Sequence, residues 1–544
     1  MTVGSNGAWG ATVWSSSVNT DPYCGLKTTI KSGEHGSQRT ANDALMGVYV
    51  SSRNTGTFNT AASMKVEGGW IYNLNGGPGP NAARAGRNSI FIYITGGNID
   101  TVVGGAGQVL TYGNRIVSVT DGIVNYNVFG GSNGATSSGA TDGQLNGSSV
   151  VYVGGNAQVG DSTYVSTTGN WDAGTGNVFG NGNGRQNQIN SCGSNESAIV
   201  IIDGNANILS NVYGGGNYGA VGFVSTQATA KTDIKILGGI IQEDVYGAGN
   251  RAGAGGGTTT TIATINITMT GGQVLGNIYG GSNIAGIVTG STNLNILEGI
   301  IETNIYGGGK GGPSGGAPGT ITGGTFVSQD SNVTIGSNEL SPSIGGSVYG
   351  GSAFGSVNGA SNVGTVSIYN TTVIVNNGNI TGSVFGGGQG DNTFTPWVMG
   401  NITVTINDGN IGCVYGGNDQ AGTPNGSIIV YLNGGTIGQS YGGGNNSTVS
   451  NTKIYLQGAT VDSLYGGSNI SGATITSQVI VTSGTALNIF GGNNLGGSTY
   501  TSTIDINGGS IRKCIWRRKS SLYNGYQYIN KWRDHRQCLW RAAI

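Results

Sequence analysis

The chain has 544 residues, 108 of them glycine, and it is 36% hydrophobic but only 9% charged. Such glycine content with only 8 prolines and no collagen triplet indicates turns at a regular interval, and the apolar content together with the low charge disfavours disorder. Eight of the 23 basic residues and one of the 24 acidic residues lie in 513–544, which leaves an acidic body of 15 basic and 23 acidic residues. No lysine or arginine occurs from Gly311 to Thr452, so we expect no nucleic-acid partner.

The cysteines and the apolar runs exclude several other classes. Cys24, Cys192, Cys413, Cys514 and Cys538 lack metal-type spacing, so they predict neither a disulfide framework nor a zinc site. No apolar run is long enough for a transmembrane helix, and the first residues lack the pattern of a signal peptide.

Residues 1–62 do not fit the pattern of the rest and are interpreted as an N-terminal cap or the end of a preceding domain. Cys24 and His35 could form a nucleophile and base pair, but nothing local supports that pair, and a structural role is favoured. We expect residues 63–512 to form one repeat domain.

Each repeat begins with an alternating apolar strand and a glycine turn. Pairs such as Ile234/Ile236, Val366/Ile368 and Ile429/Tyr431 are expected to fill the interior, because period-two alternation places one set of side chains on one face. The early strand Ile90–Ile94 is also apolar on its second face, through Phe91 and Tyr93. This predicts that something covers that strand from outside.

The second part of each repeat is an aliphatic–aromatic pair followed by glycines and asparagine. The aromatic positions recur 24 to 50 residues apart, as a structural unit with loop insertions would. They are Phe129, Phe179, Tyr213, Tyr246, Tyr279, Tyr306, Tyr349, Phe385, Tyr415, Tyr441, Tyr465 and Phe490. We expect these rings to form a ladder, either inside the core, which we favour, or outside as a carbohydrate-stacking strip.

The asparagines after the aromatic pair are expected to stack at a turn as an amide ladder. They are Asn217, Asn250, Asn283, Asn445, Asn469 and Asn493. Segments such as Asn217–Lys231 and Gly311–Thr320 are predicted to be surface loops. No helical period appears, so the sequence predicts an all-β fold, a right-handed parallel β-helix (β-solenoid) of about 15 coils with glycine-rich turns and loop insertions.

Residues 513–544 break the repeat where Asn-Val-Tyr-Gly-Gly-Gly-Asn is due. Read one nucleotide later, codons for the seven residues from Lys513 to Lys519 can encode that motif. Our hypothesis is a one-base slip near codon 512–513, so that this tail is frameshifted and not natively folded. The alternative is a genuine basic tail for an anionic polymer.

Residues for catalysis or metal binding are scarce. His35 is the one histidine outside the tail. Glu243, Asp244 and Glu302 fall at related positions but form no clear acid pair for sugar hydrolysis, and Gly387–Asp391 resembles a calcium-binding nonapeptide only faintly. The sequence therefore predicts no catalytic residue, no metal ligand and no cofactor.

The repeats in 63–512 resemble the glycine-rich β-solenoid repeats of bacterial surface adhesins, including autotransporter-passenger-like proteins. The resemblance implies an extracellular or cell-surface location and a non-enzymatic role in adhesion or surface structure, with glycans or surface proteins as partners. A polysaccharide-active β-helix enzyme (hydrolase or lyase) and a phage-type fibre adhesin remain alternatives.

Overall fold

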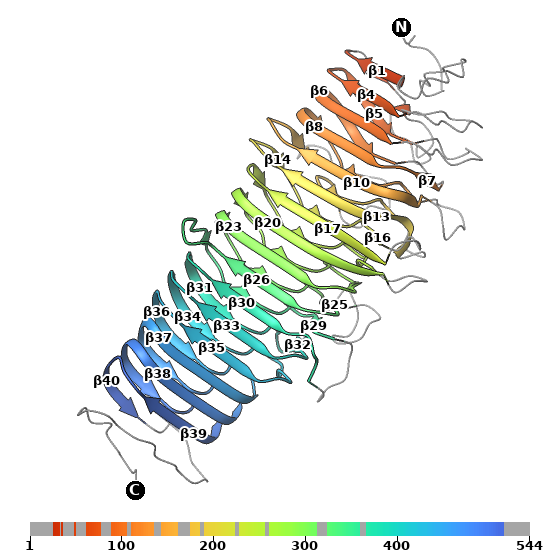
Figure 1. Ribbon diagram of the computed structural model, residues 1–544. Coiled ribbons are helices and arrows are strands. Elements are labelled where there is room, and N and C mark those ends of the chain that lie inside the picture. The colour runs from red at the N-terminus through yellow and green to blue at the C-terminus, as the bar shows by residue number, and fades with distance from the viewer. Residues whose placement is uncertain are drawn as a thin grey trace. The chain divides into compact units, whose positions relative to one another are not determined.

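A computed structural model describes residues 26–32, 34–35, 48–49, 61–77, 89–105, 110–134, 143–161, 174–184, 190–222, 228–255, 261–312, 324–359 and 366–515 (Figure 1). The chain divides into two compact units, the first comprising Met1–Gly276 with Ala285–Gly290 and the second Asn277–Ile284 with Ser291–Ile544. Each unit is described by itself. The described residues contain strands and turns but no helix.

In the first unit, successive copies of the alternating strand pair with one another in parallel. These strands are β1 (Leu26–Ile30), β4 (Ala62–Val66), β6 (Ile90–Val103), β8 (Arg115–Val124), β10 (Leu145–Val153), β13 (Asn190–Ile202), β17 (Thr229–Ile236) and β20 (Ile262–Val274). The register aligns equivalent inward residues, such as Ile92, Val117 and Val151, all of them fully buried. Burying this row removes apolar surface from water along the interior of the unit, which is the main stabilising term.

The shorter strands of the first unit also pair in parallel, and β9, β12, β15 and β19 contain the aliphatic–aromatic pair. The shorter strands are β2 (Glu34–His35), β3 (Val48–Tyr49), β5 (Trp70–Asn75), β7 (Thr111–Tyr112), β9 (Val128–Phe129), β11 (Gln158–Val159), β12 (Val178–Phe179), β14 (Asn207–Ile208), β15 (Val212–Tyr213), β16 (Gly219–Val221), β18 (Ile240–Ile241), β19 (Val245–Tyr246) and β22 (Gly286–Val288).

The second unit repeats this arrangement. Its alternating strands pair in parallel in chain order, and Ile335, Val375 and Ile406 form part of a fully buried inward row. These strands are β23 (Thr292–Ile301), β26 (Ser331–Ile335), β30 (Thr371–Val375), β33 (Ile402–Ile406), β35 (Ile428–Leu432), β37 (Val449–Tyr465), β38 (Ala473–Phe490) and β39 (Ser498–Ile506). The others are β21 (Ile278–Tyr279), β24 (Ile305–Tyr306), β25 (Thr325–Val327), β27 (Ser343–Ile344), β28 (Val348–Tyr349), β29 (Ser356–Val357), β31 (Asn379–Phe385), β32 (Trp397–Val398), β34 (Asn410–Tyr415), β36 (Thr436–Tyr441) and β40 (Ser510–Ile515).

The glycine turn after the first strand is required by its backbone geometry. Gly239 has a φ of 76°, and a Cβ added there would lie 2.6 Å from the carbonyl oxygen of Ala206 in the preceding coil. Gly435 has a φ of 80° at the corresponding turn of the second unit. Only glycine adopts this conformation readily and allows the neighbouring coil to approach so closely.

Two of the predicted interior pairs are wrong. Val366 and Ile368 lie outside any strand, and Ile368 is 84% exposed, because the strand of that coil is β30. Ile429 and Tyr431 lie on the outer face of β35, where the inward residues are Ile428, Val430 and Leu432. This strand is apolar on both faces, so alternation alone does not identify its inner side.

Strand pairing extends into segments expected to differ from the repeat. β1, β2 and β3 lie inside the segment interpreted as a cap, and β1 pairs with β4 while β2 and β3 pair with β5. β16 lies inside Asn217–Lys231, which is therefore not entirely loop. β40 pairs with β38 through Ile515.

The all-β class and the parallel β-helix are confirmed. The number of coils, the right-handed winding and the domain boundaries at 62 and 512 stay predictions. Cys24 and residues 516–544 lie outside the described residues.

Candidate functional site

The aromatic residues of the repeat stack inside each unit. In the first unit, Phe129, Phe179, Tyr213 and Tyr246 have ring centroids 4.6 to 5.0 Å apart and planes within 9° of one another. The second unit contains a longer stack with centroids 4.6 to 4.9 Å apart. Its members are Tyr279, Tyr306, Tyr349, Phe385, Tyr415, Tyr441, Tyr465 and Phe490. All of these rings are buried, so they are not accessible for stacking on a sugar.

Part of the predicted amide ladder is formed by direct side-chain hydrogen bonds. Asn250 Nδ2 donates to Asn217 Oδ1 at 2.9 Å in the first unit. In the second unit, Asn469 Nδ2 donates to Asn445 Oδ1 at 2.9 Å. Asn283 lies half-buried in the second unit. These bonds satisfy the polar groups of the turn from coil to coil.

Asn493 does not belong to this ladder, because the next amide in the row is that of Asn494, which donates to Asn469 Oδ1 at 3.0 Å. Asn493 instead connects its own turn to the turn of the preceding coil. Its Oδ1 accepts hydrogen bonds from the Ser468 N–H and the Thr474 hydroxyl, and its Nδ2 donates to the Gly472 carbonyl. The ladder assignment for this coil was wrong by one residue, because the sequence does not show which of two adjacent asparagines points along the stack.

A buried carboxylate interrupts the amide row of the second unit. Asp419 is 7% exposed, and its oxygens accept hydrogen bonds from the Tyr349 hydroxyl, from Gln420 Nε2 at 2.9 Å and from Asn445 Nδ2 at 2.8 Å. Burial, and then the Asp419 charge, raise the pKa of Tyr349 well above its ordinary value. The phenol therefore stays neutral and acts as a donor to the carboxylate.

A second row of amide side chains lies directly before the aliphatic–aromatic pairs. Asn177 Nδ2 donates to Asn127 Oδ1 at 3.0 Å, and Asn211 Nδ2 donates to Asn177 Oδ1 at 3.1 Å. The second unit contains the same contact between Asn304 and Asn277 at 3.3 Å. The sequence signal for this row is an asparagine directly before the aliphatic–aromatic pair, which occurs in several repeats.

The acids considered for catalysis are engaged in structural contacts. Glu243 Oε2 accepts hydrogen bonds from the Ser210 hydroxyl and from Asn211 Nδ2, both at 2.7 Å. Asp244 Oδ2 accepts from the Tyr246 hydroxyl at 2.6 Å. Glu302 is exposed in the second unit.

The glycine segment compared with a calcium-binding repeat forms a tight turn. Asp391 Oδ1 accepts hydrogen bonds from the backbone N–H groups of Thr393 and Phe394, at 2.7 and 2.6 Å. Within the described ranges, no group of three or more His, Cys, Asp or Glu side chains could hold a metal ion.

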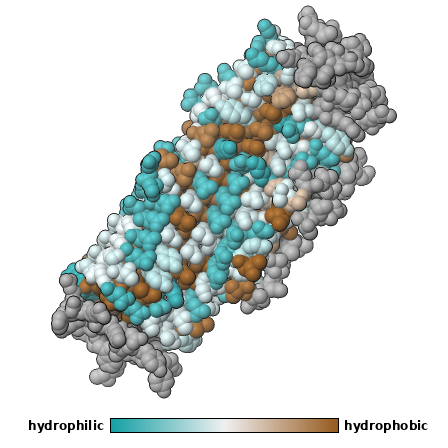
Figure 2. Space-filling model, viewed as in Figure 1, coloured by the Kyte–Doolittle hydropathy of each residue, from teal (hydrophilic) through white to brown (hydrophobic). Residues whose placement is uncertain are grey.

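The outer face of the first unit has an apolar strip. We define the outer strip as the outward residues of β6, β8, β10 and β13: Phe91, Tyr93, Ile116, Ser118, Val150, Tyr152, Ile199 and Ile201. Parallel register aligns them in two rows, one running from Phe91 to Ile199 and the other from Tyr93 to Ile201. Figure 2 shows apolar surface gathered over these strands. Tyr93 is 41% exposed, and its ring plane lies within 7° of that of Phe91.

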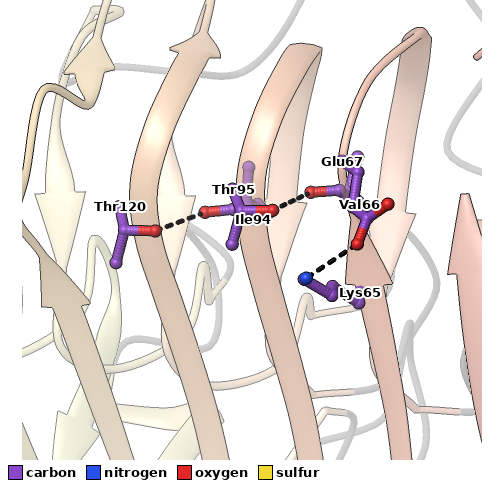
Figure 3. A network of polar contacts seen from close by, with 6 residues as sticks. All are labelled: Lys65, Val66, Glu67, Ile94, Thr95 and Thr120. Carbon is purple, nitrogen blue, oxygen red and sulfur yellow. Dashed lines mark hydrogen bonds and ion pairs between the residues drawn. The ribbon is translucent and has the colours of Figure 1, made fainter. Parts of the chain in front are cut away.

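Charged and amide side chains surround the strip but do not enter it. On β4, Lys65 Nζ lies 2.7 Å from Glu67 Oε1, while Thr95 and Thr120 donate to backbone carbonyls of the neighbouring strand (Figure 3). At the opposite end, Lys235 of β17 aligns with Ile201.

Polar groups also line the strand ends beside the strip, and we call Asp121, Asn156, Asp203 and Asn205 the rim. Tyr152 donates its hydroxyl to Asp203 Oδ2 at 3.1 Å, and burial and this contact raise the pKa of Tyr152. Asn205 Nδ2 donates to Asn156 Oδ1 at 3.2 Å.

The second unit has a smaller outer aromatic pair. Tyr431 and Tyr455 align in register, with ring centroids 5.0 Å apart. Lys453 lies in the adjacent outer row beside Ile429, so a basic group accompanies this pair. The outer strip of the first unit also has a lysine at each end of one row, Lys65 beside Tyr93 and Lys235 beside Ile201, but its apolar face extends over four strands, so it is the stronger candidate for a binding surface.

Searches of protein-family models, curated proteins and solved structures find no match to this chain. In the part of the chain that the structure describes, no helix has the length and apolar character needed to cross a membrane. The class defined by the geometry is a β-solenoid with an apolar strip on its outer face.

Proposed function

We propose that this chain is a non-enzymatic, adhesin-like β-solenoid protein that is displayed on the cell surface or secreted and binds through the outer face of its long strands. The observation that carries the proposal is the outer strip. An apolar patch that is contiguous and framed by polar side chains is typical of an interaction surface.

The contacts of the acids favour binding over catalysis. A glycosidase needs two carboxyl groups on either side of the scissile bond, one of them free to donate a proton. Glu243 and Asp244 instead accept hydrogen bonds from Ser210, Asn211 and Tyr246 within one unit. Their geometry supports a role in holding the turn together.

The repeat architecture also favours binding. Coils stacked about 4.8 Å apart present equivalent side chains at a fixed interval, so an extended ligand contacts several coils at once. The aromatic and amide rows stabilise the interior and leave the outward positions free to vary, as Tyr93 and Lys235 in one outer row illustrate.

The experiment is a glycan array probed with the full chain, combined with a reducing-sugar release assay on every bound polymer. We expect binding without release. Glu243→Gln with Asp244→Asn is the matched control, because it removes both carboxylates and keeps their shape. Release by the parent chain that this variant abolishes would show an enzyme. Labelling intact and lysed cells with an antibody tests the location, and signal from lysed cells alone would contradict surface display.

A further inference from the structure

We propose that the outer strip of the first unit binds a neutral, extended β-1,4-linked polysaccharide, which lies across β6, β8 and β10 and stacks on Phe91, Tyr93 and Tyr152. This inference rests on the proposed function and specifies its ligand and site.

The aromatic rings of the strip provide a surface on which sugar rings can stack. Phe91 and Tyr93 are neighbours on one strand, with ring centroids 6.4 Å apart and nearly parallel planes. Tyr152 lies two strands away in the row of Tyr93, beyond the small Ser118, which places the two tyrosines roughly 9.6 Å apart by strand spacing. Sugar rings in an extended β-1,4 chain present flat C–H faces, and such faces stack on aromatic side chains that have an apolar body and a polar end.

The rim provides hydrogen-bond acceptors beside the aromatic rings. Asp203 Oδ2 already accepts from the Tyr152 hydroxyl and Oδ1 from the Gly204 N–H at 2.7 Å, so the carboxylate is held in place beside the ring. A carboxylate oxygen has more than one acceptor site, and the phenol oxygen that donates to Asp203 still has lone pairs. Asp203 and Tyr152 can therefore accept hydrogen bonds from sugar hydroxyls at the edge of a stacked ring.

Charge selects a neutral polymer. The eight residues of the strip carry no charge, and the charged groups nearest to it on the strand ends are the carboxylates Asp121 and Asp203. Glu196 on β13 adds a third acid beyond the other end of the strands, and burial raises its pKa. Lys65 aligns with Tyr93 and Lys235 aligns with Ile201, so a basic group lies at each end of this row, and Lys65 forms an ion pair with Glu67 at 2.7 Å. An anionic polysaccharide would meet carboxylates along the rim, whereas a neutral one meets acceptors for its hydroxyls.

The test uses the full chain in calorimetric titrations with cellohexaose, mannohexaose and N-acetylated chitohexaose, and with an oligogalacturonate as the anionic comparison. We expect at least one neutral hexasaccharide to bind and the oligogalacturonate not to bind. Tyr93→Ser with Tyr152→Ser should weaken binding by about tenfold or more, because two of the three stacking rings are lost. Serine already occupies this face at Ser63 and Ser118, so the fold should accept the change.

Two further variants make the result specific. Tyr500→Ser removes a tyrosine that is 55% exposed and lies outside both rows, and it should leave binding unchanged. Asp203→Asn keeps the shape of the rim and should weaken binding less than the double variant. Unfolding midpoints of all variants should equal that of the parent.

The outcomes separate this inference from the proposed function. A neutral hexasaccharide that binds the parent and the double variant equally would move the site elsewhere and leave the adhesin-like function standing. Failure of all three probes to bind, or self-association of the chain that the double variant abolishes, would overturn the ligand assignment. Sugar release would instead refute the non-enzymatic function.

Discussion

The hydroxyl of Tyr349 donates a hydrogen bond to Asp419 Oδ2 across 3.1 Å, although 70 residues separate the two along the chain. Asp419 also accepts from Gln420 and Asn445, so one buried carboxylate connects the aromatic stack to the amide row. We expect Asp419→Ala to destabilise the protein by about 1–3 kcal/mol, because several buried donors lose their acceptor. Tyr349→Phe, which removes one donor only, should cost less. Chemical denaturation measures the free energy of unfolding of both variants. A larger loss of stability in Tyr349→Phe than in Asp419→Ala would contradict this prediction.

Alkaline pH should unfold the protein through its buried tyrosines. Burial is the largest cause that raises the pKa of Tyr349, Tyr415 and Tyr441 in the folded state. A tyrosine in the unfolded chain titrates near pH 10, so below that pH both states are protonated and the stability is fully present. Above it the unfolded state loses protons first, and each such tyrosine lowers stability by about 1.4 kcal/mol per pH unit.

The measurement for this prediction is a series of denaturation curves at increasing pH, together with phenolate absorbance. We expect a flat stability up to about pH 9 and a decline above about pH 10. Phenolate signal from the buried rings should appear only as the protein unfolds. Titration of these rings with the fold intact would show that water reaches them.

Removing one ring from the stack should open the coils next to it. Tyr306 lies 4.8 Å from both Tyr279 and Tyr349, and its hydroxyl donates to Gln389 Oε1 at 2.7 Å. Tyr306→Ala should cost about 3–5 kcal/mol, as truncation of a buried aromatic residue does. Tyr306→Phe keeps the ring and should cost about 1 kcal/mol for the lost hydrogen bond.

Because coils contact mainly their neighbours, hydrogen exchange should report this damage locally. Amides of β21, β24 and β28 should lose protection in Tyr306→Ala, while those of β38 should keep it. Uniform loss across the second unit would show that its coils unfold as one cooperative block.

The repeat pattern predicts the interior well where one face of a strand is polar. Ile234 and Ile236 alternate with Asp233 and Lys235, and the structure buries the isoleucines. The pattern fails in β35, where residues on both faces are apolar, and at Arg115, which occupies an inward position. Burial lowers the pKa of Arg115 to about 10. Neither placement follows from local alternation, because register with the neighbouring coils decides which face turns inward.

The outer strip was visible in the sequence only in part. Phe91 and Tyr93 stand on one strand, so alternation already marked them as a second apolar face. Ile116, Val150 and Ile199 come from three other coils separated by insertions of different length. Only the parallel register places them in one row.

Substitutions of the adjacent Asn493 and Asn494, at the last amide turn, should differ in their effect on the free energy of unfolding. Asn469→Ala removes two links of the ladder, the bond to Asn445 and the bond from Asn494, together with its contact with the Tyr415 hydroxyl, which should cost about 1–2 kcal/mol. Asn493→Ala leaves several buried groups unpaired, including the Ser468 N–H and the Thr474 hydroxyl of the preceding coil, and should cost more. Urea denaturation measures the loss of stability in Asn469→Ala and Asn493→Ala. Asn494→Ala, which removes the ladder bond to Asn469, is the control. Equal losses for Asn493→Ala and Asn494→Ala would argue against their different roles.

The final coil offers a test of the repeat itself. Lys513, Cys514 and Ile515 pair in register with Asn488, Ile489 and Phe490, at the positions where the repeat has asparagine, an aliphatic residue and an aromatic ring. Lys513→Asn with Cys514→Val and Ile515→Tyr restores that motif, which is the one encoded by the shifted reading frame. The new ring should stack on Phe490 and add about 0.5–1.5 kcal/mol beyond its burial. We therefore expect a higher denaturation midpoint and stronger hydrogen-exchange protection in β38 and β40.

Ile515→Ala, which removes apolar contact at the same position, is the control and should lower both the midpoint and the protection. If the triple substitution lowers the midpoint, residues 513–515 are adapted to their present neighbours and the frameshift hypothesis loses its structural support.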